Sequence, residues 1–197
     1  GTVTVSGVDF QNLDNTSYLK YEGPTDPTFN GSLGNMFTYK QFKLNVFVTY
    51  SGGNKIRLDP VFSGQYNDLS SMTKDFKNRW EKPGDENITD VPGILSSRQY
   101  HDNNELRIAY NAYNYSSARI ADGAFIRMKE VSLSYDVPNQ LFKNTPFTDV
   151  SLKLQATNLF LIYADSKLNG QDPEFFRSGG VSAPMPKQFT FTLKFGL

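Results

Sequence analysis

Apolar and polar residues alternate along several stretches of the chain. The segment PKQFTFTLKFGL (residues 186–197) has an apolar residue at every second position: Phe189, Phe191, Leu193, Phe195 and Leu197. Because successive side chains of a β-strand point to opposite faces, this period of two predicts a strand with one apolar face. Residues 42–50, 124–135 and 150–160 show the same pattern. These strands are longer than the ~5–6 residues usual in globular sheets.

Two details of the alternation predict how the strands begin and bend. Apolar positions are odd-numbered in residues 33–39 and even-numbered in residues 42–50. This change of parity across Lys40 and Gln41 predicts a two-residue hairpin turn. In residues 124–135, Ile126 and Met128 have the opposite parity to the apolar residues that follow. That shift predicts a β-bulge, or a strand end outside the buried zone.

The segments between the strands differ greatly in length. Residues 51–122 form a long polar stretch without sustained alternation, in which Met72, Phe76 and Trp80 are spaced by four and predict a short helix at 69–80. Residues 138–149 and 161–186 are turn-rich connections, and residues 1–32 are mostly loop with one extended piece at 2–10. The sequence therefore predicts five principal strands joined by alternating short and long connections.

Alternation alone leaves two fold classes open. A soluble β-sandwich that binds glycans through its loops also has strands with one apolar face. Outer-membrane barrels, however, combine short periplasmic turns with long extracellular loops, and the connection lengths favour this class. In hydrocarbon, every backbone polar group must be paired, so strands survive there only in a closed barrel. Five strands cannot close one, and we expect the chain to supply part of a larger barrel.

Composition excludes several functions. Lys plus Arg and Asp plus Glu number 20 each, so no global charge favours a nucleic-acid partner. The chain has no cysteine, and His101 is its single histidine. We therefore expect no enzymatic activity, no cofactor and no metal site. Asp165, Asn169 and Asp172 have oxygen ligands suited to Ca²⁺, but their spacing does not follow an EF-hand loop.

Six segments in order carry a family resemblance: residues 23–56, RW with TDVPG at 79–93, GAFIRMKEVSLSYDVP at 123–138, ATNLF at 156–160, GQDPE at 170–174, and the PMPKQFTF entry to the last strand. The chain resembles the SusC-like, TonB-dependent outer-membrane transporters of Bacteroidetes. The resemblance implies an all-β fold, with residues 1–197 forming the last five strands of a 22-stranded transmembrane antiparallel β-barrel. Long extracellular loops and short periplasmic turns are expected, while the plug and about seventeen strands are absent.

The resemblance also implies a function and partners. We expect nutrient import, of an oligosaccharide or a peptide, by an integral protein of the cell outer membrane. The implied partners are the N-terminal remainder of the barrel with its plug, a SusD-like surface lipoprotein, TonB acting through the plug, and outer-membrane lipid. The remainder is expected either as a separate polypeptide, with Gly1 following a break in an extracellular loop, or as a missing part. The alternating residues 189–197 would act as the assembly signal.

Three sets of residues are candidates for functional roles. Tyr and Trp rings in loops can stack on sugars, although packing within the loop is the competing explanation. The substrate-binding candidates in residues 51–122 are Trp80, Tyr100, Tyr110, Tyr113 and Tyr115. The expected lumen-facing residues are Thr38, Lys43, Asn45, Thr49, Lys153, Gln155, Thr190, Thr192 and Lys194. The expected aromatic girdle at the membrane boundary comprises Tyr39, Tyr50, Tyr135 and Phe160.

Overall fold

The computed structural model describes residues 19–61, 73–176 and 184–196. The chain divides into two compact units. The sheet unit comprises Pro24–Asn54 and Asp122–Leu197, and the loop unit comprises Lys55–Ala121 with the residues before Pro24. The predicted extended piece at 2–10, part of the predicted helix at 69–80, and Leu197 lie outside the described residues.

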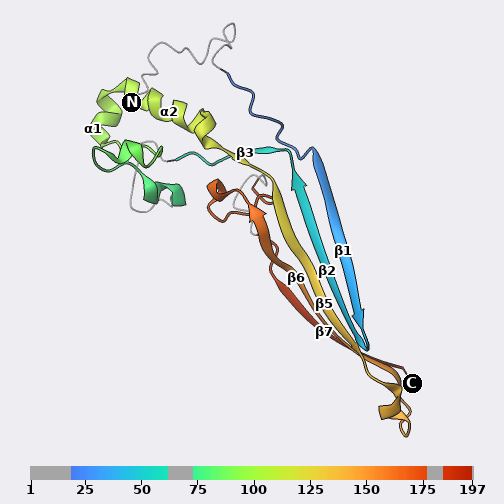
Figure 1. Ribbon diagram of the computed structural model, residues 1–197. Coiled ribbons are helices and arrows are strands. Elements are labelled where there is room, and N and C mark those ends of the chain that lie inside the picture. Colours follow the sequence, from blue (N-terminus) through green and yellow to red (C-terminus); the bar gives the residue numbers. More distant parts are fainter. Residues whose placement is uncertain (1–18, 62–72, 177–183, 197) are drawn as a thin grey trace. The chain divides into compact units, whose positions relative to one another are not determined.

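The sheet unit contains one five-stranded antiparallel sheet (Figure 1). Its strands are β1 (Phe29–Tyr39), β2 (Phe42–Gly52), β5 (Phe125–Asp136), β6 (Thr148–Ala164) and β7 (Gln188–Gly196). They lie in the order β1-β2-β5-β6-β7, so each strand pairs with the next one of the five along the chain. The five predicted strands are confirmed. Strand β6 extends four residues beyond the predicted end, to Ala164, because the sequence past residue 160 stays rich in β-forming residues.

The connections differ in length between the two ends of the sheet. At one end, residues 40–41 join β1 to β2, and residues 137–147 with the short 3-10 helix η4 (Asn139–Phe142) join β5 to β6. At the other end are the long segments 53–124 and 165–187, the second containing η5 (Ser166–Leu168). Tyr39 lies opposite Phe42, and Lys40 has a φ of 52°, as a tight hairpin turn requires. The predicted two-residue turn is confirmed.

The predicted irregularity in β5 is a bulge at Lys129. The register of β5 on β2 skips this residue: residue 130 lies opposite Phe47, and Met128 lies opposite Val48. One extra residue reverses the parity of everything that precedes it in the strand. Met128 and Ile126, which are even-numbered, therefore lie on the same face of the sheet as Val131, an odd-numbered apolar residue of the same strand.

One face of the sheet, here called the apolar face, is lined by rows of apolar side chains. The central row runs across all five strands through Phe37, Leu44, Leu133, Leu154 and Phe191. In the described part of the chain these side chains are not covered by a second sheet, and Leu154 and Phe191 are 57% and 63% exposed. A soluble sandwich would bury this face under another sheet, so the sandwich alternative does not describe the structure.

The loop unit contains more helix than the one short helix expected in this polar stretch. It contains β3 (Lys55–Arg57), η1 (Lys74–Asn78), η2 (Asp85–Asn87), α1 (Ser97–Asp102), α2 (Asn104–Tyr115), η3 (Ser117–Arg119) and β4 (Ile120–Asp122). Strands β3 and β4 pair, which brings the two ends of the segment together. Within the described part of the helix predicted at 69–80, the structure has the short η1, and α1 and α2 were not predicted. None of the helices within the described ranges is long and apolar enough to cross a membrane.

Local hydrogen bonds explain where the two α-helices begin. The Ser96 hydroxyl accepts from the Gln99 backbone N–H at 3.2 Å, and the Gln99 side-chain oxygen accepts from the Ser96 N–H at 3.0 Å. This reciprocal pair is a capping box. The Asn103 side-chain oxygen accepts from the N–H groups of Glu105 and Leu106 at 3.1 and 3.3 Å, which caps α2. Apolar periodicity does not show these helices, because α2 buries Tyr110 and Asn114 rather than an aliphatic stripe.

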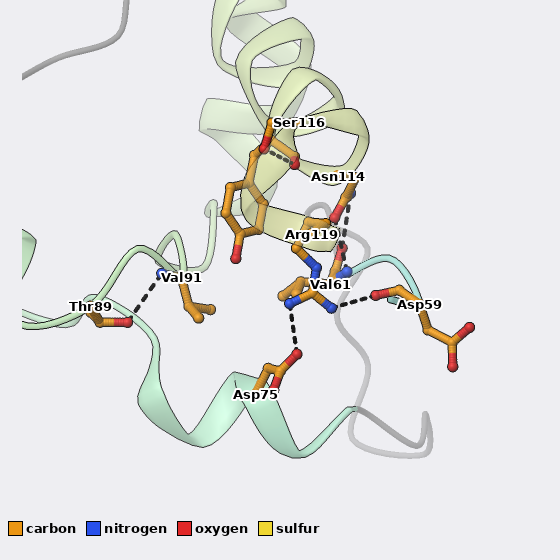
Figure 2. Close-up of polar contacts among 9 residues, drawn as sticks. Asp59, Val61, Asp75, Thr89, Val91, Asn114, Ser116 and Arg119 are labelled. Carbon is orange, nitrogen blue, oxygen red and sulfur yellow. Dashed lines mark hydrogen bonds and ion pairs between the residues drawn. The ribbon is translucent and has the colours of Figure 1, made fainter. Parts of the chain in front are cut away.

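A small core joined by polar contacts holds the loop unit together (Figure 2). Val61, Phe76 and Val91 form the buried apolar cluster, with Tyr113 packed against it. The buried Asn114 side chain accepts from the Val61 N–H at 2.9 Å and donates to the Val61 carbonyl at 3.2 Å.

A buried arginine adds a second set of polar contacts to this core (Figure 2). The Arg119 guanidinium, 4% exposed, pairs with the Asp75 carboxylate at 2.6 Å and donates to the Asp59 carbonyl at 2.6 Å. Segments distant in the sequence are therefore fixed by charge and hydrogen bonding as well as by apolar packing.

Replacing Asn114 with alanine is expected to loosen the loop unit. The substitution leaves the Val61 N–H and carbonyl buried without their partners, at a cost of about 1–3 kcal/mol. Amide hydrogen exchange in the loop unit measures the resulting loss in the free energy of opening. Asn111→Ala is the matched control, because Asn111 lies on the exposed face of the same helix. Equal exchange in the two variants would contradict the structural role of Asn114.

Candidate functional site

The face of the sheet opposite the apolar face, here called the polar face, collects the residues expected to line a lumen. The register places Thr38, Lys43, Ser134, Lys153 and Thr192 in one row, and Met36, Asn45, Ser132, Gln155 and Thr190 in the next. Lys194 lies opposite Ser151 on the same face. The amine of Lys43 pairs with Asp136 at 2.8 Å. The structure thus brings these candidates together on one surface across the five strands.

An ion-pair cluster on the polar face holds part of the connection between β6 and β7. Arg127 of β5 donates from Nη2 to both oxygens of Asp172 at 2.5 Å, and its Nε lies 3.3 Å from Oε2 of Glu174. The side chains of Arg127 and Asp172 are each 7% exposed. The guanidinium also lies 5.5 Å from the centre of the Phe125 ring. Charge pairing in this buried setting fixes residues 172–174 against the strand.

A hollow of about 590 Å³ lies on the polar face beside this cluster. Its lining includes Asn30, Ser32, Thr49, Ser51, Phe47 and Phe125 from the sheet, and Lys129, Pro173 and Glu174 beside them. Hydroxyl and amide groups on this surface can both donate and accept hydrogen bonds, and the two Phe rings add apolar area. The hollow can therefore hold a polar molecule against the sheet.

Sequence reasoning found only part of this site. Thr49 was expected on the polar face, but Arg127, Asp172 and Glu174 were not singled out as a cluster. The signal that could have found them is the acidic pair in GQDPE together with the bulge, which turns Arg127 onto the polar face opposite Thr49. The carboxylates considered for Ca²⁺ are separate: Asp165 accepts from the N–H groups of Asp122 and Lys167 at 2.7 and 2.9 Å, while Asp172 pairs with Arg127.

The aromatic candidates of the loop unit divide into two groups. Trp80 and Tyr110 line one hollow in the loop unit. Tyr113 packs against the Val61 cluster, with the Arg119 guanidinium 5.8 Å from its ring centre. The ring of Tyr115 lies 5.7 Å from the Arg57 guanidinium, and Tyr100 contacts His101 edge to face at 5.6 Å. Of these last three rings, Tyr113 packs against the buried cluster, as the competing explanation expects, whereas Tyr115 is 66% exposed.

From the sequence we expect the chain to lack the side chains needed for catalysis or metal binding. His101 is exposed on α1 and contacts Tyr100. Across the ranges that the structure describes, no group of three or more His, Asp or Glu side chains is placed to hold a metal ion. Burial raises the pKa of the Tyr110 hydroxyl to about 12, so this group stays protonated and donates toward the Pro92 carbonyl at 3.5 Å.

The chain is similar to a curated TonB-dependent receptor and to solved structures of a peptide importer. No model of a known protein family matches the chain. The chain is 29% identical to the TonB-dependent receptor P3 of Formosa agariphila, over 88% of this chain and 16% of that protein. Its fold is similar to the RagAB peptide importer in the open-open state (TM-score 0.61, 21% identity, 90% of this chain and 18% of that one) and in the closed-closed state (0.60, 22%, 89% and 18%). The chain spans less than a fifth of the length of each of these proteins.

The substitution Asp172→Asn is expected to release the segment held by Arg127. Breaking a buried pair leaves an uncompensated charge, at a cost of about 3–5 kcal/mol. Hydrogen exchange of residues 165–176 in the intact protein measures this opening. The matched control is Asp102→Asn, because Asp102 and Arg98 form an ion pair whose side chains are 67% and 91% exposed and whose loss leaves stability almost unchanged. Unaltered exchange in the Asp172 variant would refute the role of the cluster.

Proposed function

We propose that this chain belongs to the SusC-like TonB-dependent transporters and functions in nutrient import. The chain would form part of a transmembrane barrel that takes an oligosaccharide or a peptide across the outer membrane. The family relationship supports the import class, and the RagAB structures with the same fold belong to a peptide importer. The relatives are much longer than this chain, so the complete activity requires the rest of the barrel.

The observation that carries the proposal is the exposed apolar face. Large apolar side chains on it, including Leu33, Phe37 and Phe189, are 68%, 57% and 77% exposed. On the opposite face, Arg127 and Ser132 are buried. This distribution is the reverse of that in a soluble protein, where large exposed apolar patches are rare. It suits a wall that faces acyl chains on one side and a polar lumen on the other.

Aromatic residues lie toward both ends of the apolar face. Tyr39, Phe42 and Tyr135 form a row beside the short connections, and the Phe42 and Tyr135 rings are 4.7 Å apart. Tyr50 and Tyr163 lie in a row toward the long connections. From Phe42 to Tyr50 the strand rises about 27 Å, and a strand tilt of ~35–45° reduces this to about 20 Å, near the ~25 Å apolar band of such barrels. These rows therefore support the girdle proposed for Tyr39, Tyr50 and Tyr135, while Phe160, the fourth residue proposed, lies opposite Met128, one row nearer the middle of the sheet.

The polar face would line the lumen. The residues proposed there are Lys43, Asn45, Lys153, Gln155, Thr190, Thr192 and Lys194. Facing a lysine to lipid at mid-depth costs about 2–4 kcal/mol, so the lysines on this face favour the lumen assignment. The hollow beside Arg127 and Glu174 would then contact substrate as it passes.

Strands β1 and β7 form the two edges of the described sheet. Within a membrane, their outer backbone groups need further strands as partners. We propose that β1 and β7 pair with strands of the remainder of a 22-stranded barrel, of which this chain forms the last five strands. The remainder would also carry the plug and the contact with TonB, either as a separate polypeptide or as a missing part. The alternating apolar residues of β7, Phe189, Phe191, Leu193 and Phe195, with Leu197 beyond the described residues, would serve as the assembly signal.

The long connections would face the cell exterior. Residues 53–124 and 165–187 leave the same end of the sheet, as long extracellular loops do in outer-membrane barrels. We propose that they meet a SusD-like surface lipoprotein and help enclose the substrate. The short connections would then face the periplasm.

A lysine on the apolar face is expected to impair membrane assembly. Leu154→Lys places a charge toward lipid at a cost of about 2–4 kcal/mol near mid-depth. The amount of folded protein in the outer membrane, measured by its altered migration before and after boiling, should fall. Gln155→Lys, one residue along β6 and on the polar face, is the matched control and should assemble normally. If Gln155→Lys is the more damaging substitution, the lumen and lipid faces are assigned the wrong way round.

A further inference from the structure

A second hollow lies within the loop unit, on the segment between η1 and α2. Its volume is about 460 Å³, and its lining includes Trp80, Val91, Ile94, Leu95 and Leu106. This hollow is called the Trp80 pocket. It lies in the segment that the proposed topology places outside the cell, where an incoming substrate arrives first.

Backbone contacts fix the walls of the Trp80 pocket. The Trp80 N–H donates to the Val91 carbonyl at 2.9 Å. Gly93 approaches so closely that a Cβ there would lie 2.7 Å from the Trp80 carbonyl oxygen. Tyr110 of α2 donates toward the Pro92 carbonyl on the other side. Residues 91–93 are thus held between Trp80 and α2, and the pocket is a built feature of the loop unit.

The charged groups on the lining are all acidic. Glu81, Glu86 and Asp90 line the pocket, and no Lys, Arg or His does so among the described residues. Glu81 is paired with Arg79 at 2.5 Å, which leaves Glu86 and Asp90 as the net charge. Backbone N–H groups of Glu86 itself and of Gly84 hold the pKa of the Glu86 carboxyl below its usual value. The pocket therefore presents negative charge at neutral pH.

Trp80 stands beside this charge. Its indole N–H donates to Oε2 of Glu86 at 3.2 Å, and the residue is 43% exposed. A cation next to Glu86 can therefore approach the indole ring as well as the carboxylate, and tryptophan is the best cation–π partner among the side chains. Aliphatic side chains, including Val91, Ile94 and Leu106, provide the apolar part of the lining.

The lining suits a cation on an alkyl stem better than it suits a sugar. Tyr110 is only 4% exposed and offers little ring face for stacking. The Trp80 N–H, the donor beside the carboxylates, is already bound to Glu86. The Thr89 hydroxyl and the Gln99 amide can donate to a sugar, but the charged groups of the lining are carboxylates, which only accept hydrogen bonds and attract a cation. Lysine and arginine side chains combine an apolar stem with a cationic head.

We propose that the Trp80 pocket binds the ammonium or guanidinium side chain of a basic residue in an imported peptide. The stem lies along the aliphatic lining and the head lies between Trp80, Glu86 and Asp90. This proposal rests on the import function and deepens it, since it selects peptides with basic residues as the substrate class. Binding is expected to weaken with added salt, because the charges that attract the ligand lie at the surface.

The test is equilibrium binding to the complete purified transporter complex in detergent. The probes are a capped Gly-Gly-Lys-Gly-Gly peptide, in which lysine is the only cation, and the same peptide with norleucine at that position. We expect the lysine peptide to bind about threefold to tenfold more tightly. The double substitution Glu86→Gln with Asp90→Asn should abolish this preference. Glu105→Gln, an exposed acid outside the pocket on α2, is the matched control and should preserve it.

A second variant covers the case in which the double substitution disturbs folding. Asp90→Lys adds a cation at the pocket without touching the Trp80–Glu86 hydrogen bond, and it should abolish the lysine preference alone. Equal affinity for the two peptides, or a lysine preference that survives both pocket variants, overturns the proposal. So does a neutral glucose oligosaccharide that binds and is weakened by the pocket variants while the lysine peptide is not.

Failure of this proposal is distinguishable from failure of the import function. Binding is measured at equilibrium and does not depend on transport. A protein that is water-soluble and monomeric without detergent contradicts the import function, whatever its peptide preference. A barrel that assembles in the membrane and shows no lysine preference contradicts the Trp80 pocket alone.

Discussion

The sheet depends on keeping five strands in phase. Side chains of a strand alternate strictly between the two faces, so a slip of one residue exchanges the apolar and polar sets. The bulge at Lys129 maintains the phase, because it returns Met128 and Ile126 to the face of Val48 and Tyr50. The exposed apolar rows, the lysines opposite them and the position of Arg127 all follow from this register.

The strands could be predicted from the sequence because their signal is local. Alternation located all five strands, and the parity change located both the turn at Lys40 and the bulge in β5. Helices α1 and α2 were missed because apolar periodicity was the signal sought, whereas Ser96, Gln99 and Asn103 start these helices by hydrogen bonding. The Arg127–Asp172 pair joins residues 45 positions apart, and its sequence signals, the bulge in β5 and the acidic pair in GQDPE, do not by themselves indicate that these two residues meet.

The two units are stabilised by different interactions. The sheet unit is stabilised by a continuous ladder of backbone hydrogen bonds, and its apolar side chains need no core of their own if lipid covers them. The loop unit has only a small apolar cluster around Val61, and it adds the buried contacts of Asn114 and Arg119. Buried polar groups of this kind favour one arrangement, because any alternative leaves them unpaired. A loop built this way can keep a defined pocket.

Pairing of β3 with β4 has an evolutionary consequence. The segment Lys55–Ala121 enters and leaves at adjacent positions, since Lys55–Arg57 pairs with Ile120–Asp122. A segment whose ends are already joined can be exchanged for another of different length as a cassette, at little entropic cost to its host. Under the proposed topology, which places this segment outside the cell, recognition would diversify when new segments are grafted onto this two-stranded stem, while the strand register of the sheet stays unchanged.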